Sequence, residues 1–188
     1  MAVIGLIGGS FNPAHTGHIE ISKNAFKSLR LDEVWWIVSP LNPLKKNSEL
    51  KNINERVDFA RKLNKPDFIK VKLLENAGEK SYSINLIKKL LSTFKEHKFI
   101  WLMGADNLAN FNRWYMYEEI INLINIAIFP RNEDLGLPNV FNELYNDSQI
   151  KFSEINKLSN INPPAWSIIK MQKINISSTA IRNGTHNQ

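Results

Sequence analysis

The segment between residues 8 and 18 has the residue types and the spacing for binding phosphate. It reads Gly-Gly-Ser-Phe-Asn-Pro-Ala-His-Thr-Gly-His and follows an apolar run, residues 3–7, that predicts a buried strand. A helical pattern begins at Thr16, and the free N–H groups and dipole of a helix N-terminus attract phosphate. Gly8 and Gly9 allow the backbone to approach a ligand closely. The segment is neither the Rossmann fingerprint nor the Walker loop, because it lacks Gly-x-Gly-x-x-Gly and Gly-Lys-Ser/Thr.

Two histidines of this segment, His15 and His18, are three residues apart. This spacing allows both to face one bound phosphate, from the end of the loop and from the first helical turn. The same pair is also compatible with helix capping or with metal binding. Phosphate binding is favoured over a metal site because residues 8–18 contain no carboxylate and no third histidine.

A second segment, residues 176–182, repeats this chemistry near the other end of the sequence. It reads Ile-Ser-Ser-Thr-Ala-Ile-Arg and predicts a helix that opens at Ser177 or Ser178. Hydroxyl groups bind phosphate oxygens directionally, and the forked guanidinium of Arg182 suits a polyphosphate. Taken alone the segment is more typical of a helix cap. Together with residues 8–18 it predicts a second wall of one phosphate site.

Apolar runs alternate with amphipathic helical patterns along the chain. Strands are predicted at residues 3–7, 34–38, 68–74, 99–104 and 126–129, with weaker signals at 150–152 and 168–176. Helices are predicted at residues 16–29, after a cap at Asn54, after Ser83, and at 107–123. The alternation predicts a doubly wound, mostly parallel α/β sheet with helices on both faces, whose ligands bind at the carboxyl ends of the strands. Residues 130–146 are predicted to form an irregular surface excursion.

Length and composition predict one folded domain over residues 1–188. Hydrophobic residues make up 43% of the chain and charged residues 22%, which is typical of a globular protein. The absence of cysteine excludes a disulfide framework and a thiolate-bound metal. No membrane span or signal peptide is predicted, so we expect a soluble, cytoplasmic protein. The net charge of +6 favours anionic partners, but the lysines are scattered as on an ordinary solvated surface.

The two phosphate-binding segments together resemble the nucleotidyltransferase superfamily related to class I aminoacyl-tRNA synthetases. Within it, residues 39–45, 81–83 and 103–114 resemble the bacterial nicotinate-nucleotide adenylyltransferases. The matching blocks extend from Gly8 to Arg182. The resemblance implies a Rossmann-like nucleotidyltransferase fold and adenylyl transfer from ATP, with Mg²⁺, to nicotinate mononucleotide. The products would be deamido-NAD and pyrophosphate, in a step of NAD biosynthesis.

The resemblance also implies roles for individual residues. It assigns catalysis to His15, His18 and Arg182. It assigns ATP binding to Gly8, Gly9, Ser10, Phe11, His15, His18, Gly104, Asp106, Asn107, Ser178, Thr179 and Arg182. It assigns nicotinate mononucleotide binding to Asn42, Lys45, Tyr82, Ser83, Asp106 and Trp114. No metal-ligating residue is implied.

The residues themselves leave several of these roles open. Trp114 lies beyond the glycine that ends a predicted strand, and there stacking on a ligand and packing in the core are equally compatible with the sequence. Asp106 suits either a helix cap or a ligand contact. Lys45 has the character of an ordinary surface charge. Trp101, inside a predicted strand, belongs to the core.

Two alternative functions remain compatible with the motifs. One is the same transfer to another acceptor, phosphopantetheine or nicotinamide mononucleotide. The other is a nucleotide sensor or RNA-binding module that keeps the fold without turnover. The presence together of His15, His18, Ser178, Thr179 and Arg182 favours an enzyme acting on two small molecules, without nucleic acid or membrane. The oligomeric state is open.

Overall fold

A six-stranded parallel sheet forms the centre of the molecule. The computed structural model describes residues 1–41, 50–75, 81–108, 110–130, 145–169 and 178–182, and the fold is given over these residues. The strand order is β3-β2-β1-β4-β5-β6, and every neighbouring pair is parallel. The strands are β1 Val3–Gly9, β2 Glu33–Val38, β3 Ile69–Lys72, β4 Lys98–Gly104, β5 Asn125–Phe129 and β6 Trp166–Ile168. This confirms the predicted doubly wound, Rossmann-like α/β fold.

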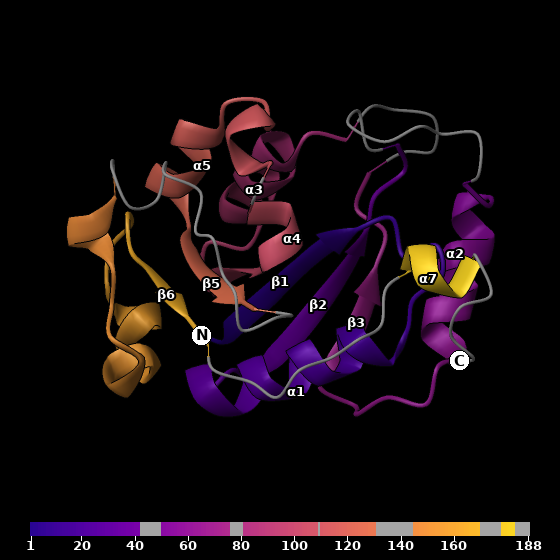
Figure 1. Ribbon diagram of the computed structural model, residues 1–188, viewed down its shortest axis with the longest axis horizontal. Helices are drawn as coiled ribbons and strands as arrows, with labels where there is room; N and C mark the ends of the chain where they lie inside the picture. The colour runs from indigo at the N-terminus through magenta and orange to yellow at the C-terminus, as the bar shows by residue number, and fades with distance from the viewer. Residues whose placement is uncertain (42–49, 76–80, 109, 131–144, 170–177, 183–188) are drawn as a thin grey trace.

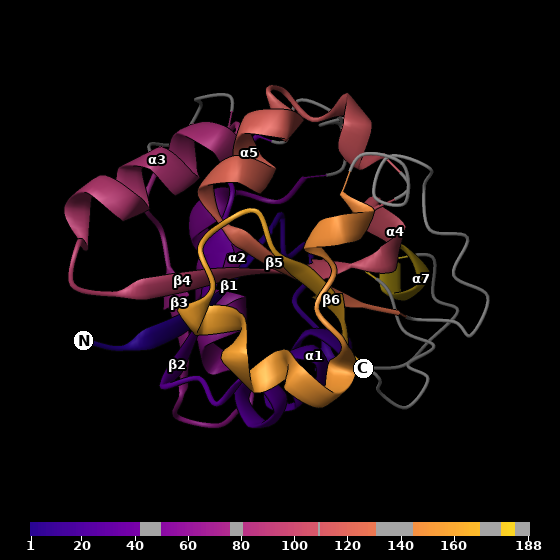
Figure 2. The same cartoon turned by 90° about the vertical axis from the view of Figure 1, so that its left-hand side faces the viewer.

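Helices cover both faces of the sheet (Figure 1). Among the described residues the α-helices are α1 Thr16–Leu29, α2 Ile53–Lys62, α3 Ser83–Thr93, α4 Ala105–Leu108, α5 Tyr117–Leu123 and α7 Ser178–Arg182. The 3₁₀ helices are η2 Phe111–Arg113, η3 Asn146–Ser148 and η4 Phe152–Asn160. Helices α3, α4 and α5 lie on one face and α1 lies on the other, where η4 contacts it (Figure 2).

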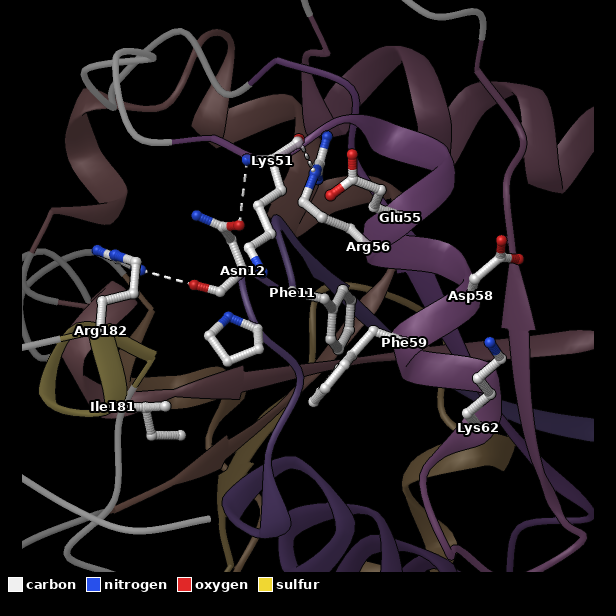
Figure 3. A pocket seen from close by; sticks show the side chains of 11 residues that line it. Phe11, Asn12, Lys51, Glu55, Arg56, Asp58, Phe59, Lys62, Ile181 and Arg182 are labelled. Carbon is white, nitrogen blue, oxygen red and sulfur yellow. Dashed lines mark hydrogen bonds between the residues drawn. The ribbon is translucent and has the colours of Figure 1, made fainter. Parts of the chain in front are cut away.

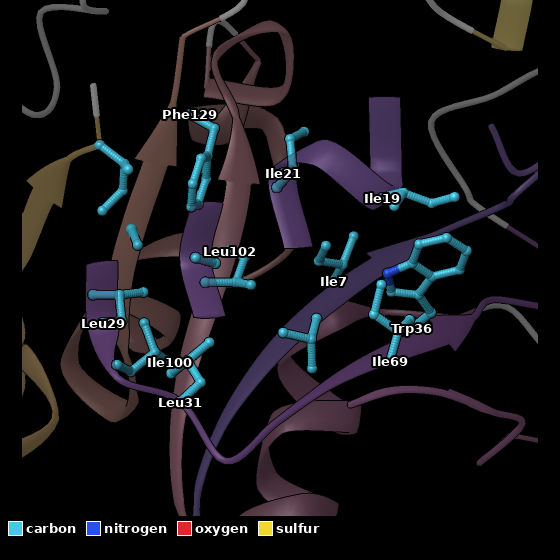
Figure 4. Packing of buried hydrophobic residues seen from close by; sticks show 14 of the residues in the cluster. Ile7, Ile19, Ile21, Leu29, Leu31, Trp36, Ile69, Ile100, Leu102 and Phe129 are labelled. Atoms are coloured by element: carbon cyan, nitrogen blue, oxygen red, sulfur yellow. The ribbon is translucent and has the colours of Figure 1, made fainter. Parts of the chain in front are cut away.

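Two hydrophobic clusters fill the space between the sheet and these helices. Side chains along a strand point alternately to the two faces, so Trp36 joins the α1 cluster and its neighbour Trp35 joins the α3 and α5 cluster. Figure 4 shows part of the first cluster, in which Leu29 of α1 packs with sheet residues that include Leu102 and Phe129. Burial on both faces explains why these strands are apolar throughout.

The segment predicted as one helix over residues 107–123 is broken into three pieces, so this prediction was wrong. It comprises α4, η2 and α5, and Met116 between the last two adopts the left-handed conformation with φ of 54°. Asparagine is a weak helix former, and two asparagines flank Phe111. Interruption of the helix lets Phe111 enter the core while Trp114 remains half-buried beside it.

Three other boundaries differ from the prediction. The cap of α2 is Asn52, whose side chain accepts a hydrogen bond from the N–H of Asn54 at 2.9 Å. Residues 150–152 form no strand. Ile155 and Leu158 are buried three residues apart, a spacing that suits η4, which begins at Phe152. Strand β6 ends at Ile168, and residues 170–176 and most of 130–146 lie outside the described residues.

The strand order places a binding crevice next to β1. From β1 the chain builds outward through β2 and β3, and it then returns to β4 on the other side of β1 and continues outward to β6. Such a reversal leaves a crevice at the carboxyl ends of the two central strands, where ligands of doubly wound folds bind. Here β1 ends at Gly9 and β4 ends at Gly104. The topology therefore brings the glycine-containing carboxyl ends of β1 and β4 together at this crevice.

Gly8 should be necessary for stability in a way that Gly9 is not. A Cβ atom at position 8 would lie 2.7 Å from the ring of the buried Trp101, whereas one at position 9 would lie at an ordinary 3.6 Å from Phe11. We expect Gly8→Ala to lower the free energy of unfolding by about 1–3 kcal/mol, because a packed core does not readily accept an added methyl group. Urea unfolding followed by tryptophan fluorescence measures the effect. Gly9→Ala is the matched control, and equal losses in the two variants would contradict this packing argument.

Candidate active site

The loop after β1 is held in an unusual conformation by its own phenylalanine. Phe11 has a φ of 46°, in the left-handed region, which costs a residue other than glycine about 1–2 kcal/mol. Its ring is buried and stacks on Trp36, with centroids 5.3 Å apart and planes 19° apart. Burial of an aromatic ring stabilises by more than this strain costs. Phe11 therefore contributes to the loop as a core anchor.

The two histidines lie side by side at the start of α1. His15 is the N-cap residue and is buried, and His18 is half-buried in the first turn. Their ring centroids are 3.8 Å apart, and the N–H of His15 donates to Nδ1 of His18 at 3.2 Å. Because Nδ1 accepts, a neutral His18 carries its proton on Nε2. The prediction that both histidines share the start of the helix is confirmed, and capping is part of what His18 does.

A buried hydrogen-bond chain fixes this end of α1 to the sheet. Trp36 of β2 donates from Nε1 to the hydroxyl of Ser22 at 2.8 Å, and that hydroxyl donates to the carbonyl oxygen of His18 at 2.7 Å. Trp36 also contacts the His18 ring, with centroids 5.7 Å apart. The position of His18 is thus set by a core tryptophan that the sequence analysis did not connect to the site.

The structure brings together the two segments that the sequence predicts to bind phosphate, although they lie near opposite ends of the chain. Ser178 of α7 donates from its hydroxyl to the carbonyl oxygen of Pro13 at 2.9 Å. Arg182, at the other end of α7, donates to the carbonyl oxygen of Asn12 at 2.7 Å (Figure 3). The contacting residues are 165 and 170 positions apart in the sequence. The structure therefore places α7 against the loop after β1, and a shared phosphate site there stays a prediction.

A buried arginine that the sequence analysis missed also contacts this loop. Arg56 of α2 is only 2% exposed, and its guanidinium donates to the carbonyl oxygen of Ser10 at 2.6 Å. Burial lowers the pKa of Arg56 below its usual value. The helical spacing could have indicated that Arg56 is buried. It lies on the same helix face as the buried Ile53 and Ala60, where an apolar residue is expected.

Aromatic side chains surround the other side of the crevice. Trp114 is half-buried and meets Trp101 edge-on at 6.3 Å between centroids, and Trp101 lies under Gly8. Tyr82 is the N-cap of α3 and contacts Tyr115, an exposed ring that the sequence analysis did not select, at 5.0 Å between centroids. Core packing thus accounts for part of the Trp114 surface and leaves part of it exposed.

The remaining predicted residues are distributed as follows. Gly104 ends β4, and Asp106 and Asn107 lie on α4 directly after it, at the carboxyl end of the strand next to β1. Ser83 is the first residue of α3, where helical N–H groups lack intrahelical acceptors. Thr179 lies on α7. Asn42 and Lys45 lie outside the described residues.

A cavity adjoins the loop on the side of α2 and α7 (Figure 3). It has a volume of about 780 Å³, and Phe11, Asn12 and Arg182 of the two segments predicted to bind phosphate line it. Lys51 and Lys62 of its wall are cationic, whereas its other charged residues include Glu55 and Asp58. Trp114 and Tyr82 do not line it, so the cavity extends one end of the site and does not include the aromatic end.

The described residues contain no group of three histidine, cysteine, aspartate or glutamate side chains able to hold a metal ion. Mg²⁺ is commonly held by substrate phosphates with only one or two protein carboxylates, and such a donor set needs no protein cage. In the same part of the chain no helix is long and apolar enough to cross a membrane.

Comparisons with known proteins agree with this geometry. The model of the cytidylyltransferase-like family matches residues 6–184. A probable nicotinate-nucleotide adenylyltransferase of Agrobacterium fabrum is 37% identical over 183 residues, covering 96% of this chain and 98% of that protein. One of Rhizobium meliloti with the same description is 34% identical over 182 residues, covering 96% and 97%. The structure of Plasmodium falciparum nicotinic acid mononucleotide adenylyltransferase complexed with NaAD has the same fold, with a TM-score of 0.73 at 19% identity, covering 97% of this chain and 83% of that one.

Proposed function

The chain belongs to the nicotinate-nucleotide adenylyltransferases, within the cytidylyltransferase-like family, and from this premise we propose how its residues divide the reaction. The protein transfers the adenylyl group of ATP to nicotinate mononucleotide and releases pyrophosphate. The product is deamido-NAD, and the reaction is a step in NAD biosynthesis. Membership in this family of enzymes favours catalysis over the alternative function, a nucleotide sensor or RNA-binding module without catalytic activity.

The chemistry requires positioning and charge neutralisation more than proton transfer. An oxygen of the 5′-phosphate of nicotinate mononucleotide attacks the α-phosphorus of ATP in line, and the bond from that phosphorus to the pyrophosphate oxygen breaks. The attacking oxygen is already anionic at neutral pH, so no general base is needed. The rate then comes from alignment of the two phosphates and from donors that stabilise the developing charge.

The docking of α7 on the loop is the observation that carries the proposed ATP site. It brings the hydroxyl of Ser178 and the guanidinium of Arg182 to the loop between Gly9 and the two histidines. His15, His18 and Arg182 contact the phosphates as the catalytic residues, and Ser178 and Thr179 bind phosphate oxygens. Gly104, Asp106 and Asn107, at the end of β4, meet the adenosine.

Nicotinate mononucleotide binds at the aromatic end of the crevice in this proposal. The exposed part of Trp114 stacks on the pyridine ring, and the N–H groups of Tyr82 and Ser83 at the start of α3 receive the nicotinate carboxylate. Helix N-termini favour carboxylates for the same reason that they favour phosphates. Asn42, Lys45 and Asp106 complete this site through contacts to the carboxylate, the phosphate and the ribose.

Mg²⁺ is the metal cofactor in this proposal, and when bound with ATP it would supply charge that neutralises the phosphate oxygens. We propose that the chain acts as one domain, residues 1–188, in the cytoplasm. Its partners are ATP and nicotinate mononucleotide, and neither nucleic acid nor a membrane is required.

Pyrophosphate release tests the acceptor site directly. With ATP and Mg²⁺ we expect release chiefly with nicotinate mononucleotide, and much less with equal concentrations of nicotinamide mononucleotide or phosphopantetheine. A site built for a carboxylate leaves a buried donor unpaired when an amide replaces it. Chelation of the metal should stop the release, and added Mg²⁺ should restore it. Equal rates with the nicotinate and nicotinamide nucleotides would contradict the assigned carboxylate contacts.

A further inference from the structure

Arg56 connects three segments of backbone at the edge of the crevice. Its guanidinium donates to four carbonyl oxygens: Lys51 at 3.0 Å, Ser10 at 2.6 Å, Ser39 at 2.9 Å and Pro40 at 3.0 Å. Ser10 belongs to the phosphate loop, whereas Ser39 and Pro40 follow β2. We propose that Arg56 is a positioning residue for adenylyl transfer, which holds the loop after β1 and residues 39–41 after β2 in one fixed relation. The inference rests on the site assigned under the proposed function.

On the ATP side, Arg56 sets the direction of one peptide group in the phosphate loop. The Ser10–Phe11 peptide bond is trans, so its carbonyl and its N–H point in opposite directions. Because Arg56 holds the Ser10 oxygen toward α2, the N–H of Phe11 points away from that helix. Arg182 and Ser178 bind the oxygens of Asn12 and Pro13 in the same way. Carbonyl oxygens that would repel a phosphate are thus kept occupied by donors.

On the nicotinate side, the connection passes through Leu41. This residue directly follows Ser39 and Pro40, and its carbonyl oxygen accepts the N–H of Ser81 at 2.9 Å. Ser81 precedes Tyr82, the N-cap of α3. A shift of the Arg56 guanidinium therefore moves both the loop after β1 and the start of α3, which are the two places assigned to the two substrates.

Stability alone gives a poor reason for an arginine at this position. No carboxylate of the described residues forms an ion pair with Arg56, and a buried charge without a counter-ion costs free energy. Its helix neighbours on the buried face are apolar. The planar guanidinium with five N–H donors is the one side chain able to bind four carbonyl oxygens from separate segments. The geometry therefore favours positioning over packing.

The test measures kcat and both KM values for Arg56→Ala and Arg56→Lys, at a temperature where near-ultraviolet circular dichroism shows folded protein. We expect Arg56→Ala to lower kcat/KM for both substrates by between about 10- and 100-fold, because small misplacements of reacting groups have effects of this size. Arg56→Lys keeps the charge but loses the fork, and we expect about a tenfold loss. Added guanidinium ion, at concentrations far below denaturing ones, should restore part of the activity of Arg56→Ala and none of that of Arg56→Lys.

Arg61→Ala is the matched control, because Arg61 is an exposed arginine on the same helix and should be replaceable. Three results would overturn the positioning role: kcat/KM of Arg56→Ala within about threefold of wild type, a fall in kcat alone that equals the unfolded fraction, or no rescue by guanidinium. The proposed active site has a separate test, the loss of turnover in His18→Ala. An inactive His18→Ala beside a fully active Arg56→Ala would refute this inference and leave the site standing.

Discussion

Replacement of His18 by alanine is expected to lower the turnover by about 10²-fold or more, the usual effect of removing a donor that stabilises charge in the transition state. The structure places His18 in the first turn of α1, beside His15 and against Phe11, with ring centroids 3.8 Å and 4.8 Å away. Its Nδ1 already accepts the N–H of His15, so Nε2 is the atom that we expect to donate to a phosphate oxygen in the proposed site. Single-turnover formation of deamido-NAD measures the chemical step.

Alanine at this position removes two functions of His18, and His18→Asn separates them. The asparagine side-chain oxygen lies close to where Nδ1 was, so it can still accept the N–H of His15, but nothing replaces Nε2. We expect His18→Asn to lose as much turnover as His18→Ala. It should unfold closer to wild type, because loss of a cap costs about 1 kcal/mol. A fully active His18→Asn would show that the histidine only caps α1 and would refute its catalytic role.

Replacement of Arg182 by alanine is expected to lower kcat/KM for ATP by about 10²–10³-fold, because in the proposed site it removes a forked cation from the phosphates of ATP. It also removes the hydrogen bond to the carbonyl oxygen of Asn12, which together with the Ser178 hydrogen bond to Pro13 ties α7 to the loop. The effect should appear in the ATP parameters and much less in the KM for nicotinate mononucleotide, since Arg182 lines a cavity that Trp114, assigned to the pyridine ring, does not line. Initial rates with each substrate varied in turn measure both.

Stability separates this role of Arg182 from a structural one. Arg182 is exposed and lies on a short helix, so Arg182→Ala should change the free energy of unfolding by no more than about 0.5 kcal/mol. Arg182→Lys keeps a positive charge without the fork, and we expect it to recover only part of the lost rate. Arg61→Ala, on the exposed face of α2, should behave as wild type. If Arg61→Ala and Arg182→Ala weaken ATP use equally, the effect is one of net charge and the specific role is wrong.

Much of the fold, and the placement of the two histidines, could be predicted from local sequence patterns. Continuous apolar runs are typical of buried parallel strands, and β1, β2, β4 and β5 lie where such runs occur. The first motif combines loop, glycines and helix start within eleven neighbouring residues, so the placement of His15 and His18 follows from short-range geometry alone. The resemblance to nicotinate-nucleotide adenylyltransferases also rests on short blocks, residues 39–45, 81–83 and 103–114, and the comparisons confirm it.

Only the tertiary structure decided how distant segments meet. The four carbonyl oxygens that Arg56 binds belong to residues spread between positions 10 and 51. A periodic sequence pattern does not predict which backbone oxygens a side chain will contact. The break between α4 and α5 was missed for a related reason: a helical pattern persists there, but burial of Phe111 outweighs weak local preference. The sequence by itself determined the chemistry of the site and the class of fold, because both depend on neighbouring residues. Three-dimensional packing decided the mutual position of the two loops and α7, because those contacts join residues up to 170 positions apart.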